Sequence, residues 1–259
     1  MLCETKCDNQ QDVAAIVTAM TDREQPFLRA TMEAVLSDSG IGQVVLCIEE
    51  NNTWINAVLR SLLTEPRLEI IRIPLAPLGA VRNQALKYVR LPWVAYCDGD
   101  DIWCSGKTLS QLNYAKARGC DFVGSDHYLM NENGKICAFA TASYIPMPSS
   151  WMVKTETMRQ HPFDESPFSL HQDESGEWWL RTAGIVQKAR CPKMLLQYRI
   201  RSGSLSAQTS SMRRKKQIVN LANISGLRAI ILLFTWCIWQ VTRQNNYLWC
   251  KDWGQQNEH

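Results

Sequence analysis

The chain has 259 residues, of which 46% are hydrophobic and 20% are charged. This ordinary globular balance excludes bulk disorder, and the length suits one α/β domain with an appendage or two small domains. The formal net charge of +3 gives no overall indication of nucleic-acid binding.

The ten cysteines show no regular spacing and no Cys-x-x-Cys pair. The N-terminal sequence MLCETKCDNQQD is polar and acidic, without the basic segment and apolar run of a signal peptide. Both features favour reduced thiols in a cytoplasmic protein. Zinc binding by Cys3 and Cys7 is disfavoured, because two further ligands are missing nearby in the sequence.

The first half of the chain alternates short apolar runs with segments of helical periodicity. The expected strands are 13–19, 44–48, 68–73 and 93–97, and the expected helices are 27–36, 54–63 and 79–89. Because these strands are almost wholly apolar, we expect a mainly parallel central sheet with helices on both faces. The fold class is therefore α/β.

Acidic residues follow three of these strands. They are Asp22, the pair Glu49 and Glu50, and the run from Asp98 to Asp101. In a parallel sheet, ligands bind at the carboxyl ends of the strands. We therefore expect three separate segments to converge on one crevice.

The second half is less regular. We expect a helix over 105–118, antiparallel strands from 121 onward around a turn at 131–134, and closing strands over 185–190 and 195–200. A helix over 172–182 is expected to turn Trp178 and Trp179 inward.

The C-terminal tail differs in character. A Ser- and Gly-rich linker over 202–211 precedes a basic block, Arg213 to Lys216, and an apolar segment over 218–241. A membrane-spanning helix needs roughly 20 mainly apolar residues, and the densest apolar part, 229–239, is shorter. We favour a helix at a membrane surface, assisted by the basic block. A helix packed on the domain and a true span remain alternatives.

The sequence Asp98-Gly99-Asp100-Asp101 directly follows an apolar strand. Carboxylates this close repel one another unless a cation is present. Oxygen ligands suit Mg²⁺ or Mn²⁺, which keep positions open for water and phosphate oxygens. The cluster therefore predicts a metal that holds a diphosphate, and the alternative is an acidic turn or a helix cap.

Six segments resemble, in the same order, motifs of family 2 glycosyltransferases, which share the nucleotide-diphospho-sugar transferase fold of the GT-A type. They are VVLCIEENNT (44–53), GAVRNQAL (79–86), WVAYCDGDD (93–101), the stretch 150–165, QDESGEWWLR (172–181) and YRIRSGSLS (198–206). The resemblance implies a Rossmann-like GT-A catalytic domain over 12–206, with a nucleotide-binding half, 12–101, and an acceptor and base half, 102–206. A C-terminal helical tail would occupy 207–259.

The resemblance implies an inverting, metal-dependent transfer of a sugar from a nucleotide-diphospho-sugar, with UDP-sugars favoured, to an acceptor hydroxyl. Cell-surface glycan or polysaccharide synthesis is typical of the family, with a glycan or a lipid-linked molecule as acceptor. We expect a cytoplasmic protein without a nucleic-acid partner. It would be peripheral on the cytoplasmic face of the inner membrane if 213–241 lies on the membrane.

The same resemblance assigns nucleotide binding to Thr18, Glu50, Arg82 and Asp98. Glu50 would accept a hydrogen bond from a uracil-like N–H group. Arg82 would lie near the nucleotide, with a fold-stabilising ion pair as an equally weighted alternative. Asn83 is expected to tie loop backbone together.

The resemblance assigns the metal, Mn²⁺ or Mg²⁺, to Asp98 and Asp100, with Asp100 as the main ligand. Asp101 is expected to cap the following helix if it does not join this site. The acceptor hydroxyl needs a base to take its proton. The resemblance assigns this role to Asp173 or Glu174, and we favour Asp173 because its Gln-Asp pair matches the family's Glu-Asp pair.

The sequence departs from the family pattern in several places. The first strand ends in Thr18-Ala19-Met20 instead of a Pro-Thr turn, the paired acids are glutamates, and Arg201 stands where many relatives have a metal-site histidine. His171 is the one histidine worth testing as a replacement. A catalytically degenerate, membrane-associated binding partner is one alternative function. A sugar nucleotidyltransferase is another, although 18–25 lacks the glycine-rich loop that it needs.

Overall fold

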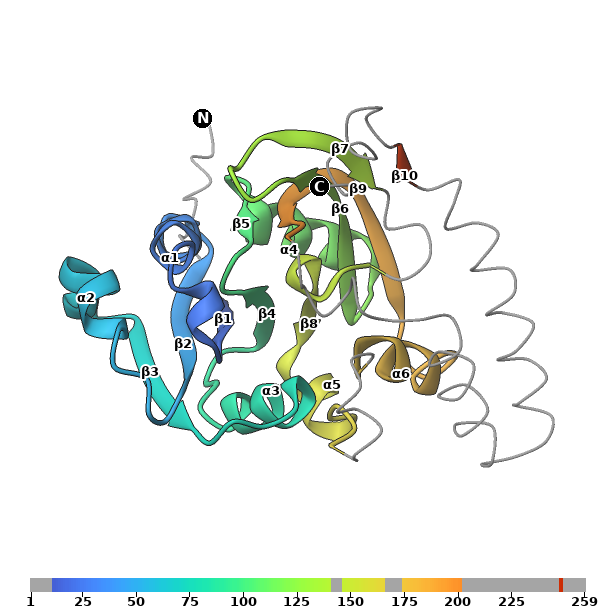
Figure 1. The fold of residues 1–259 in the computed structure, drawn as a ribbon. Coiled ribbons are helices and arrows are strands. Elements are labelled where there is room, and N and C mark those ends of the chain that lie inside the picture. Colours follow the sequence, from blue (N-terminus) through green and yellow to red (C-terminus); the bar gives the residue numbers. More distant parts are fainter. Residues whose placement is uncertain (1–10, 141–145, 166–173, 202–246, 249–259) are drawn as a thin grey trace, which may run out of the picture.

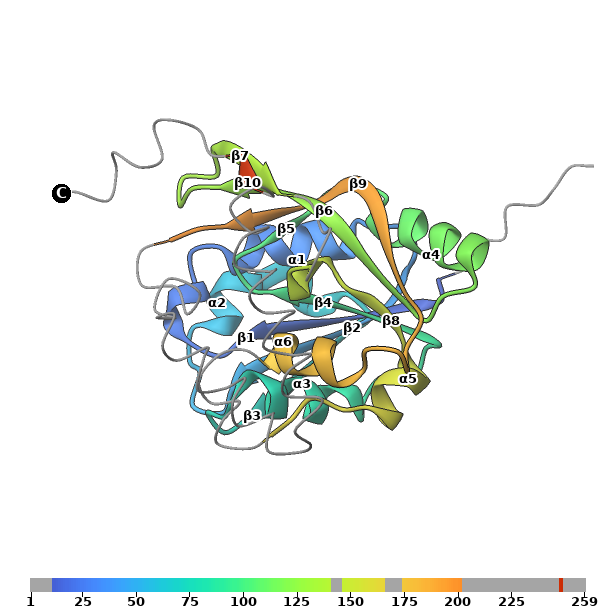
Figure 2. The ribbon, with the colours of Figure 1, turned by 90° about the vertical axis from the view of Figure 1, so that its right-hand side faces the viewer.

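The computed structural model describes residues 11–140, 146–165, 174–201 and 247–248. Within these ranges the protein forms a three-layer α/β/α arrangement. Figure 2 shows two helices on one side of the sheet, α1 (Leu28–Leu36) and α4 (Lys107–Arg118). It shows three on the other side, α3 (Leu78–Leu86), α5 (Thr155–Gln160) and α6 (Glu174–Arg181). The expected α/β class with helices on both faces is confirmed. The expected tail, 207–259, lies outside the described residues apart from the short strand at 247–248.

The centre of the sheet consists of β1 (Val13–Ala19), β2 (Ile41–Glu49), β3 (Leu68–Ile73) and β4 (Trp93–Asp98) (Figure 1). These strands pair in parallel in the order β4-β1-β2-β3. All seven residues of β1 are buried, because both faces of this strand are covered by helices. The carboxyl ends of β1, β2 and β4 therefore reach the same edge of the sheet.

Alternate residues of β1 belong to two separate hydrophobic cores. Ala15 and Val17 pack in the core under α1 (Leu28–Leu36) and α4 (Lys107–Arg118), whereas Ala14 and Ile16 pack on the opposite side. The opposite core includes residues of α3 (Leu78–Leu86), α5 (Thr155–Gln160) and α6 (Glu174–Arg181). This alternation is the normal period of a strand, and it fixes which face each helix covers.

The second half adds a mixed group of strands to the parallel sheet. β6 (Phe122–Met130) pairs antiparallel with β7 (Ile136–Ala140) and β8 (Met152–Lys154), and β8 joins this group to β4. The expected turn at 131–134 joins β6 to β7. The short strand β5 (Ile102–Trp103) pairs with β9 (Lys188–Arg199), and the short strand β10 (Tyr247–Leu248) pairs with β7.

The two expected closing strands are one strand in the structure. β9 (Lys188–Arg199) runs parallel to β6, with register shifts where Ser125 faces Cys191 and Asp126 faces Met194. Pro192 lies at this irregularity, and proline cannot donate a backbone hydrogen bond to a neighbouring strand. The prediction of two strands was wrong because the sequence interruption is a bulge.

Other expected elements are present with shifted ends. The helix over 54–63 is α2 (Ile55–Leu59) followed by the 3-10 turn η2 (Arg60–Thr64), and the helix over 172–182 is described from Glu174 onward. Trp178 is fully buried, and Trp179 is partly buried against the same core. Within the described part of the chain, the helices are too short or too polar to cross a membrane, and the segment 213–241 lies outside it.

Candidate active site

The sequence Asp98 to Asp101 forms a tight turn where β4 ends beside β1. The Gly99 amide donates to the Thr18 carbonyl at 2.8 Å, and the Asp101 amide donates to the Asp98 carbonyl at 3.1 Å. A Cβ atom on Gly99 would lie 2.9 Å from the Thr18 carbonyl oxygen and 3.1 Å from the Ala19 Cβ atom. Glycine is therefore required here, because only its bare backbone fits against the end of β1.

Asp98 is the last residue of β4, and one oxygen of its carboxylate is hydrogen-bonded. Its Oδ1 atom accepts from the Thr18 hydroxyl at 3.1 Å and from the Arg82 guanidinium at 2.7 Å. Its backbone amide donates to the Ser149 hydroxyl at 3.0 Å. The side chain is 29% exposed, so it remains accessible to a ligand while its orientation is fixed.

Arg82 lies on α3 and joins the two halves of the site. Its guanidinium is 1% exposed and pairs with Asp98 and with Glu174, the first described residue of α6. Burial alone would lower the pKa of Arg82, but these two carboxylates raise it above its ordinary value. The structure therefore contains the ion pair that sequence analysis weighed as the alternative to nucleotide contact.

Asn83 ties loop backbone together, as the sequence predicted. Its Nδ2 atom donates to the Phe163 carbonyl at 2.8 Å, and its Oδ1 atom accepts from the Phe163 amide at 3.0 Å. The Nδ2 atom also donates to the Glu165 carboxylate. These bonds fix the stretch that precedes α6.

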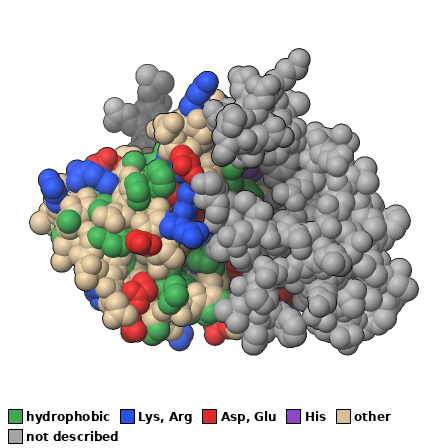
Figure 3. Space-filling view, in the orientation of Figure 1, with side chains coloured by type: hydrophobic (Ala, Val, Ile, Leu, Met, Phe, Trp, Pro, Cys, Tyr) green, Lys and Arg blue, Asp and Glu red, His purple; other side chains and the backbone are tan. Residues whose placement is uncertain are grey.

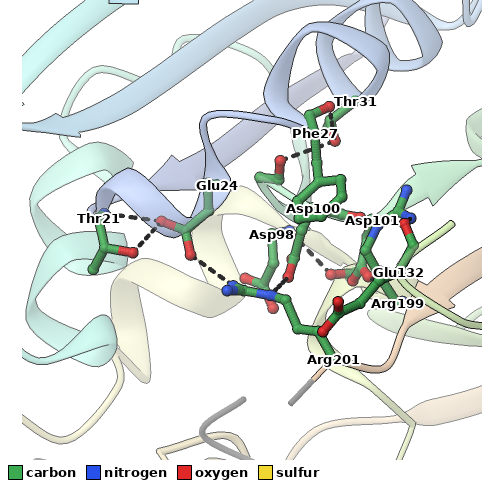
Figure 4. A network of polar contacts seen from close by, with 12 residues as sticks. Thr21, Glu24, Phe27, Thr31, Asp98, Asp100, Asp101, Glu132, Arg199 and Arg201 are labelled. Atoms are coloured by element: carbon green, nitrogen blue, oxygen red, sulfur yellow. Dashed lines mark hydrogen bonds and ion pairs between the residues drawn. The ribbon is translucent and has the colours of Figure 1, made fainter. Parts of the chain in front are cut away.

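Asp100 projects from the turn toward Arg201 and Glu24 (Figure 4). The Arg201 Nε atom donates to Asp100 Oδ2 at 2.6 Å, and its Nη2 atom donates to Glu24 Oε1 at 2.8 Å. Burial, together with the charge of Asp98, raises the pKa of Asp100, and Arg201 partly offsets this rise. The Asp100 carboxylate is therefore already paired with a cation of the protein itself, the Arg201 guanidinium.

Asp101 has a structural role that sequence analysis did not predict. It is fully buried, and its Oδ1 atom accepts from the Arg199 amide at 2.8 Å. Burial, followed by the charges of Asp100 and Asp98, raises its pKa well above the usual value. The expected helix cap is wrong, because Gly106 is the N-cap of α4.

Arg199, the last residue of β9, also binds the acidic turn. Its Nε atom donates to the Asp100 carbonyl at 2.8 Å, and its guanidinium also donates to the Glu132 carbonyl at 2.7 Å. The Arg199 Cζ atom lies 4.3 Å from the centre of the Phe27 ring. Arg199 lies in the YRIRSGSLS segment, but no local pattern in the sequence predicts its contacts with the acidic turn.

Glu24 was also missed, although the spacing Thr21-x-x-Glu24 is that of a capping box. The Glu24 carboxylate accepts from the Thr21 amide and hydroxyl, which fixes the loop after β1. Asp22 lies in the same short 3-10 turn, η1 (Asp22–Glu24). Glu24, and not Asp22, is the acid of this loop that reaches the Asp100 cluster.

Glu50 lies at the same edge but outside the hydrogen-bonded cluster. It follows β2, its side chain is exposed, and its carbonyl accepts from Arg72 at 3.0 Å. The neighbouring Glu49 instead binds the Asn51 amide with its carboxylate. Asp173 and His171 lie outside the described residues, whereas Glu174 is only 5% exposed.

The acids at this edge fit a divalent cation only together with ligands from another molecule. No group of three acidic, histidine or cysteine side chains that suits a metal occurs among the described residues. The described bonds of the Asp98 and Asp100 carboxylates use one oxygen each, Oδ1 and Oδ2 respectively. Mg²⁺ is commonly held by one or two carboxylates plus substrate phosphates, which matches this donor set.

No family model matches the chain. The glucosyltransferase WfaP of Escherichia coli, named for UDP-Glc and α-D-GlcNAc-diphosphoundecaprenol, is 22% identical over 234 residues, which cover 87% of this chain and 92% of WfaP. The WfgD protein of Escherichia coli, with the same named activity, is 24% identical over 136 residues, which cover 50% of this chain and 54% of WfgD.

Solved structures share the fold. TarS of S. aureus in complex with UDP-GlcNAc superposes with a TM-score of 0.64 at 14% identity, covering 82% of this chain and 67% of that structure. The mannosyltransferase PcManGT of Pyrobaculum calidifontis, in complex with GDP-Man and Mn²⁺, gives 0.62 at 14% identity, covering 82% and 64%.

The fold is therefore that of the GT-A type glycosyltransferases. The similarity to the two Escherichia coli glucosyltransferases supports glycosyl transfer as the activity class of this chain.

Proposed function

We propose that this protein transfers a sugar from a UDP-sugar to an acceptor hydroxyl with inversion at the anomeric carbon. The observation that carries this proposal is the partly exposed Asp98, oriented by Thr18 and Arg82 beside Asp100 at the carboxyl edge of a parallel sheet. Ligands bind at this edge in open α/β sheets. The structure of TarS with UDP-GlcNAc and the names of the two Escherichia coli relatives support a UDP-sugar as donor.

The four residues proposed for nucleotide binding divide into two pairs. Asp98 and the exposed Glu50 contact the nucleotide, with Glu50 accepting from a base N–H group. Thr18 and Arg82 are buried and act through Asp98, because both donate to its Oδ1 atom. Thr18 and Arg82 are therefore positioning residues in this proposal.

A divalent cation, Mn²⁺ or Mg²⁺, would be held by Asp98 and Asp100. When bound, it would neutralise the charge that develops on the leaving diphosphate. The Mn²⁺ in the PcManGT complex with GDP-Man supports this part of the proposal.

The base is Asp173 in this proposal, and Glu174 positions it. The Glu174 carboxylate is buried and already bonded to Arg82, so it is not available to an acceptor hydroxyl. Asp173 directly precedes it in the sequence. A carboxylate at this position takes the proton of the acceptor hydroxyl as that oxygen attacks opposite the leaving diphosphate. Attack from the opposite side inverts the anomeric centre.

The acceptor proposed here is a lipid-linked glycan in surface-polysaccharide synthesis. The names of both Escherichia coli relatives include a diphosphoundecaprenol acceptor, and this supports a lipid diphosphate acceptor for this chain. Peripheral association with the cytoplasmic face of the membrane through 213–241 would bring the site to such an acceptor. The basic block in this segment suits an anionic membrane surface.

The proposal is tested by measuring transfer from a panel of radiolabelled UDP-sugars to a synthetic GlcNAc-diphosphate lipid. The wild-type protein should use one of these donors, and Asp173→Asn should lose turnover while retaining UDP affinity. Glu174→Gln should retain the donor but lower stability, because it leaves Arg82 with one carboxylate. If Asp173→Asn remains active while a stable Glu174→Gln is inactive, the assignment of the base is wrong. Absence of both transfer and UDP binding in the wild type would favour a degenerate binding protein.

A further inference from the structure

Arg201 links two acids that come from distant parts of the chain. It lies two residues beyond β9, whereas Asp100 follows β4 and Glu24 follows β1. Its guanidinium lies between the two carboxylates in Figure 4, at 2.6 Å from Asp100 and 2.8 Å from Glu24. The three side chains are only 13% or 14% exposed. This is a built ion-pair network and not a chance surface contact.

The position of Arg201 has a direct electrostatic consequence. Asp98 and Asp100 are acids two residues apart in the same turn, and carboxylates this close repel one another unless a cation lies near them. Arg201 supplies the missing positive charge to Asp100 in the protein itself. A divalent cation that uses Asp100 as a ligand must therefore compete with this guanidinium.

We propose that Arg201 is a built-in counter-ion that leaves Asp100 for the diphosphate of the donor when a divalent cation takes that carboxylate. This inference rests on the proposed function and deepens it. A planar guanidinium matches the oxygens of a phosphate group with paired hydrogen bonds. Glu24 keeps the Arg201 side chain at the site during the exchange, because it binds a different nitrogen atom from Asp100.

The exchange predicts opposite effects of one substitution on two ligands. Without Arg201, Asp100 loses its competitor, so Mn²⁺ alone should bind more tightly. The diphosphate loses a cation, so UDP should bind more weakly. A residue that only stabilised the fold would weaken the binding of both ligands together.

The test is calorimetry on the full chain, first with MnCl₂ alone and then with UDP at saturating Mn²⁺. Arg201→Gln should raise the affinity for Mn²⁺ about tenfold and lower the affinity for UDP about tenfold, the scale of one modest charge–charge interaction. Arg190→Gln is the matched control. Arg190 lies on β9 and pairs with Asp126 at 2.5 Å, away from the acidic turn, so both affinities should stay at the wild-type values.

The outcomes separate this inference from the proposed function. If Arg201→Gln weakens both ligands or changes neither, while the wild type binds UDP, the exchange is wrong and the proposed function stands. If the wild type binds no UDP with or without Mn²⁺, both are overturned. Should Arg201→Gln fail to fold, Arg201→Lys provides the test, because one ammonium cannot match the fork that bridges both acids. It should shift the two affinities in the same opposite directions by a smaller factor, and a parallel loss of both contradicts the exchange.

Discussion

At the scale of single residues, the site depends on buried charges that are paired inside the protein. Arg82 is the main example, because it is fully buried and its two partners come from β4 and α6. It also lies 5.9 Å from the centre of the Tyr96 ring and 5.8 Å from that of Phe163. The orientation of Asp98 and the position of α6 are therefore coupled through one side chain.

Arg82→Met should lower the free energy of unfolding by about 3–5 kcal/mol, because it leaves the charges of Asp98 and Glu174 without their partner. Urea unfolding followed by circular dichroism measures this loss. Arg90→Met is the control, since Arg90 is 68% exposed in its pair with Glu69 and exposed pairs contribute little. Equal effects of the two substitutions would contradict the role given to Arg82.

Lys107 is a second buried charge, on the first turn of α4. Its Nζ atom donates to Gln111 at 2.8 Å and lies 4.1 Å from the centre of the Trp103 ring. Burial lowers its pKa from 10.5 to about 8. The unfolded chain therefore holds more protons than the folded protein between pH 8 and 10.5, and this difference makes the Lys107 contribution to stability rise with pH in that window.

Lys107→Met removes this titration. The free energy of unfolding of the wild type, minus that of the variant, should increase by about 1–3 kcal/mol between pH 7.5 and 10.5, since one pKa unit corresponds to about 1.4 kcal/mol. Urea titrations of both proteins across this range provide the measurement. A flat difference would show that the pKa of Lys107 is the same in the folded and unfolded chain, and a difference that falls with pH would show that folding raises it; either result contradicts the lowered pKa.

At the scale of elements, the site depends on the close approach of the ends of β1 and β4. The hydrogen bond from the Gly99 amide to the Thr18 carbonyl sets the start of the acidic turn. The side chains on either side of this contact, Thr18 and Asp98, then bond to each other. Any atom added at Gly99 pushes these two strand ends apart.

Gly99→Ala should destabilise the protein by about 1–3 kcal/mol through overpacking, and it should weaken UDP binding because Asp98 and Asp100 shift. Ser105→Ala, at an exposed position in the following loop, serves as the control and should leave both properties unchanged. Thermal unfolding and UDP calorimetry give the two readouts. Normal UDP affinity in Gly99→Ala would show that the close strand contact does not set the site.

Elements with a simple pattern were predictable from the sequence. The strand 68–73 was predicted with the bounds that β3 has in the structure, and β1 was likewise predicted, because apolar residues make up most of both segments. β2 begins three residues before its prediction, since Gly42 and Gln43 break the apolar pattern although Ile41 and Gln43 pair with β1. Two strands were predicted where the structure has only β9, because the interruption at Pro192 is a bulge. The hydrophobic pattern of a sequence does not distinguish a bulge from the end of a strand.

The acidic turn was predictable because it directly follows a buried strand. Its ion pairs were not, because they join residues that are far apart in sequence. Arg82 and Glu174 are 92 residues apart, and Arg201 and Glu24 are 177 residues apart. Local periodicity carries no information about such pairs. The acidic turn could therefore suggest a metal site, but the sequence could not predict that Arg201 forms an ion pair with Asp100.

At the scale of the whole molecule, Figure 1 shows the parallel strands β1 to β4 on one side and the mixed group of strands around β6 on the other. β4 carries the turn, while β9 returns beside it and supplies Arg199 and the adjoining Arg201. On the described part of the face in Figure 3, acidic and basic side chains are interspersed. The charged residues used in the proposed chemistry, Asp98, Asp100 and Arg201, are therefore those at the edge of the sheet.

The central claim is that the diphosphate of a nucleotide-sugar binds at this edge. Diffraction from crystals of the full chain grown with UDP and Mn²⁺ tests it most directly. The account predicts anomalous manganese density at Asp98 and Asp100, with the diphosphate next to it and the uracil near Glu50. An empty edge at saturating ligand, or UDP bound at another surface, would contradict the account.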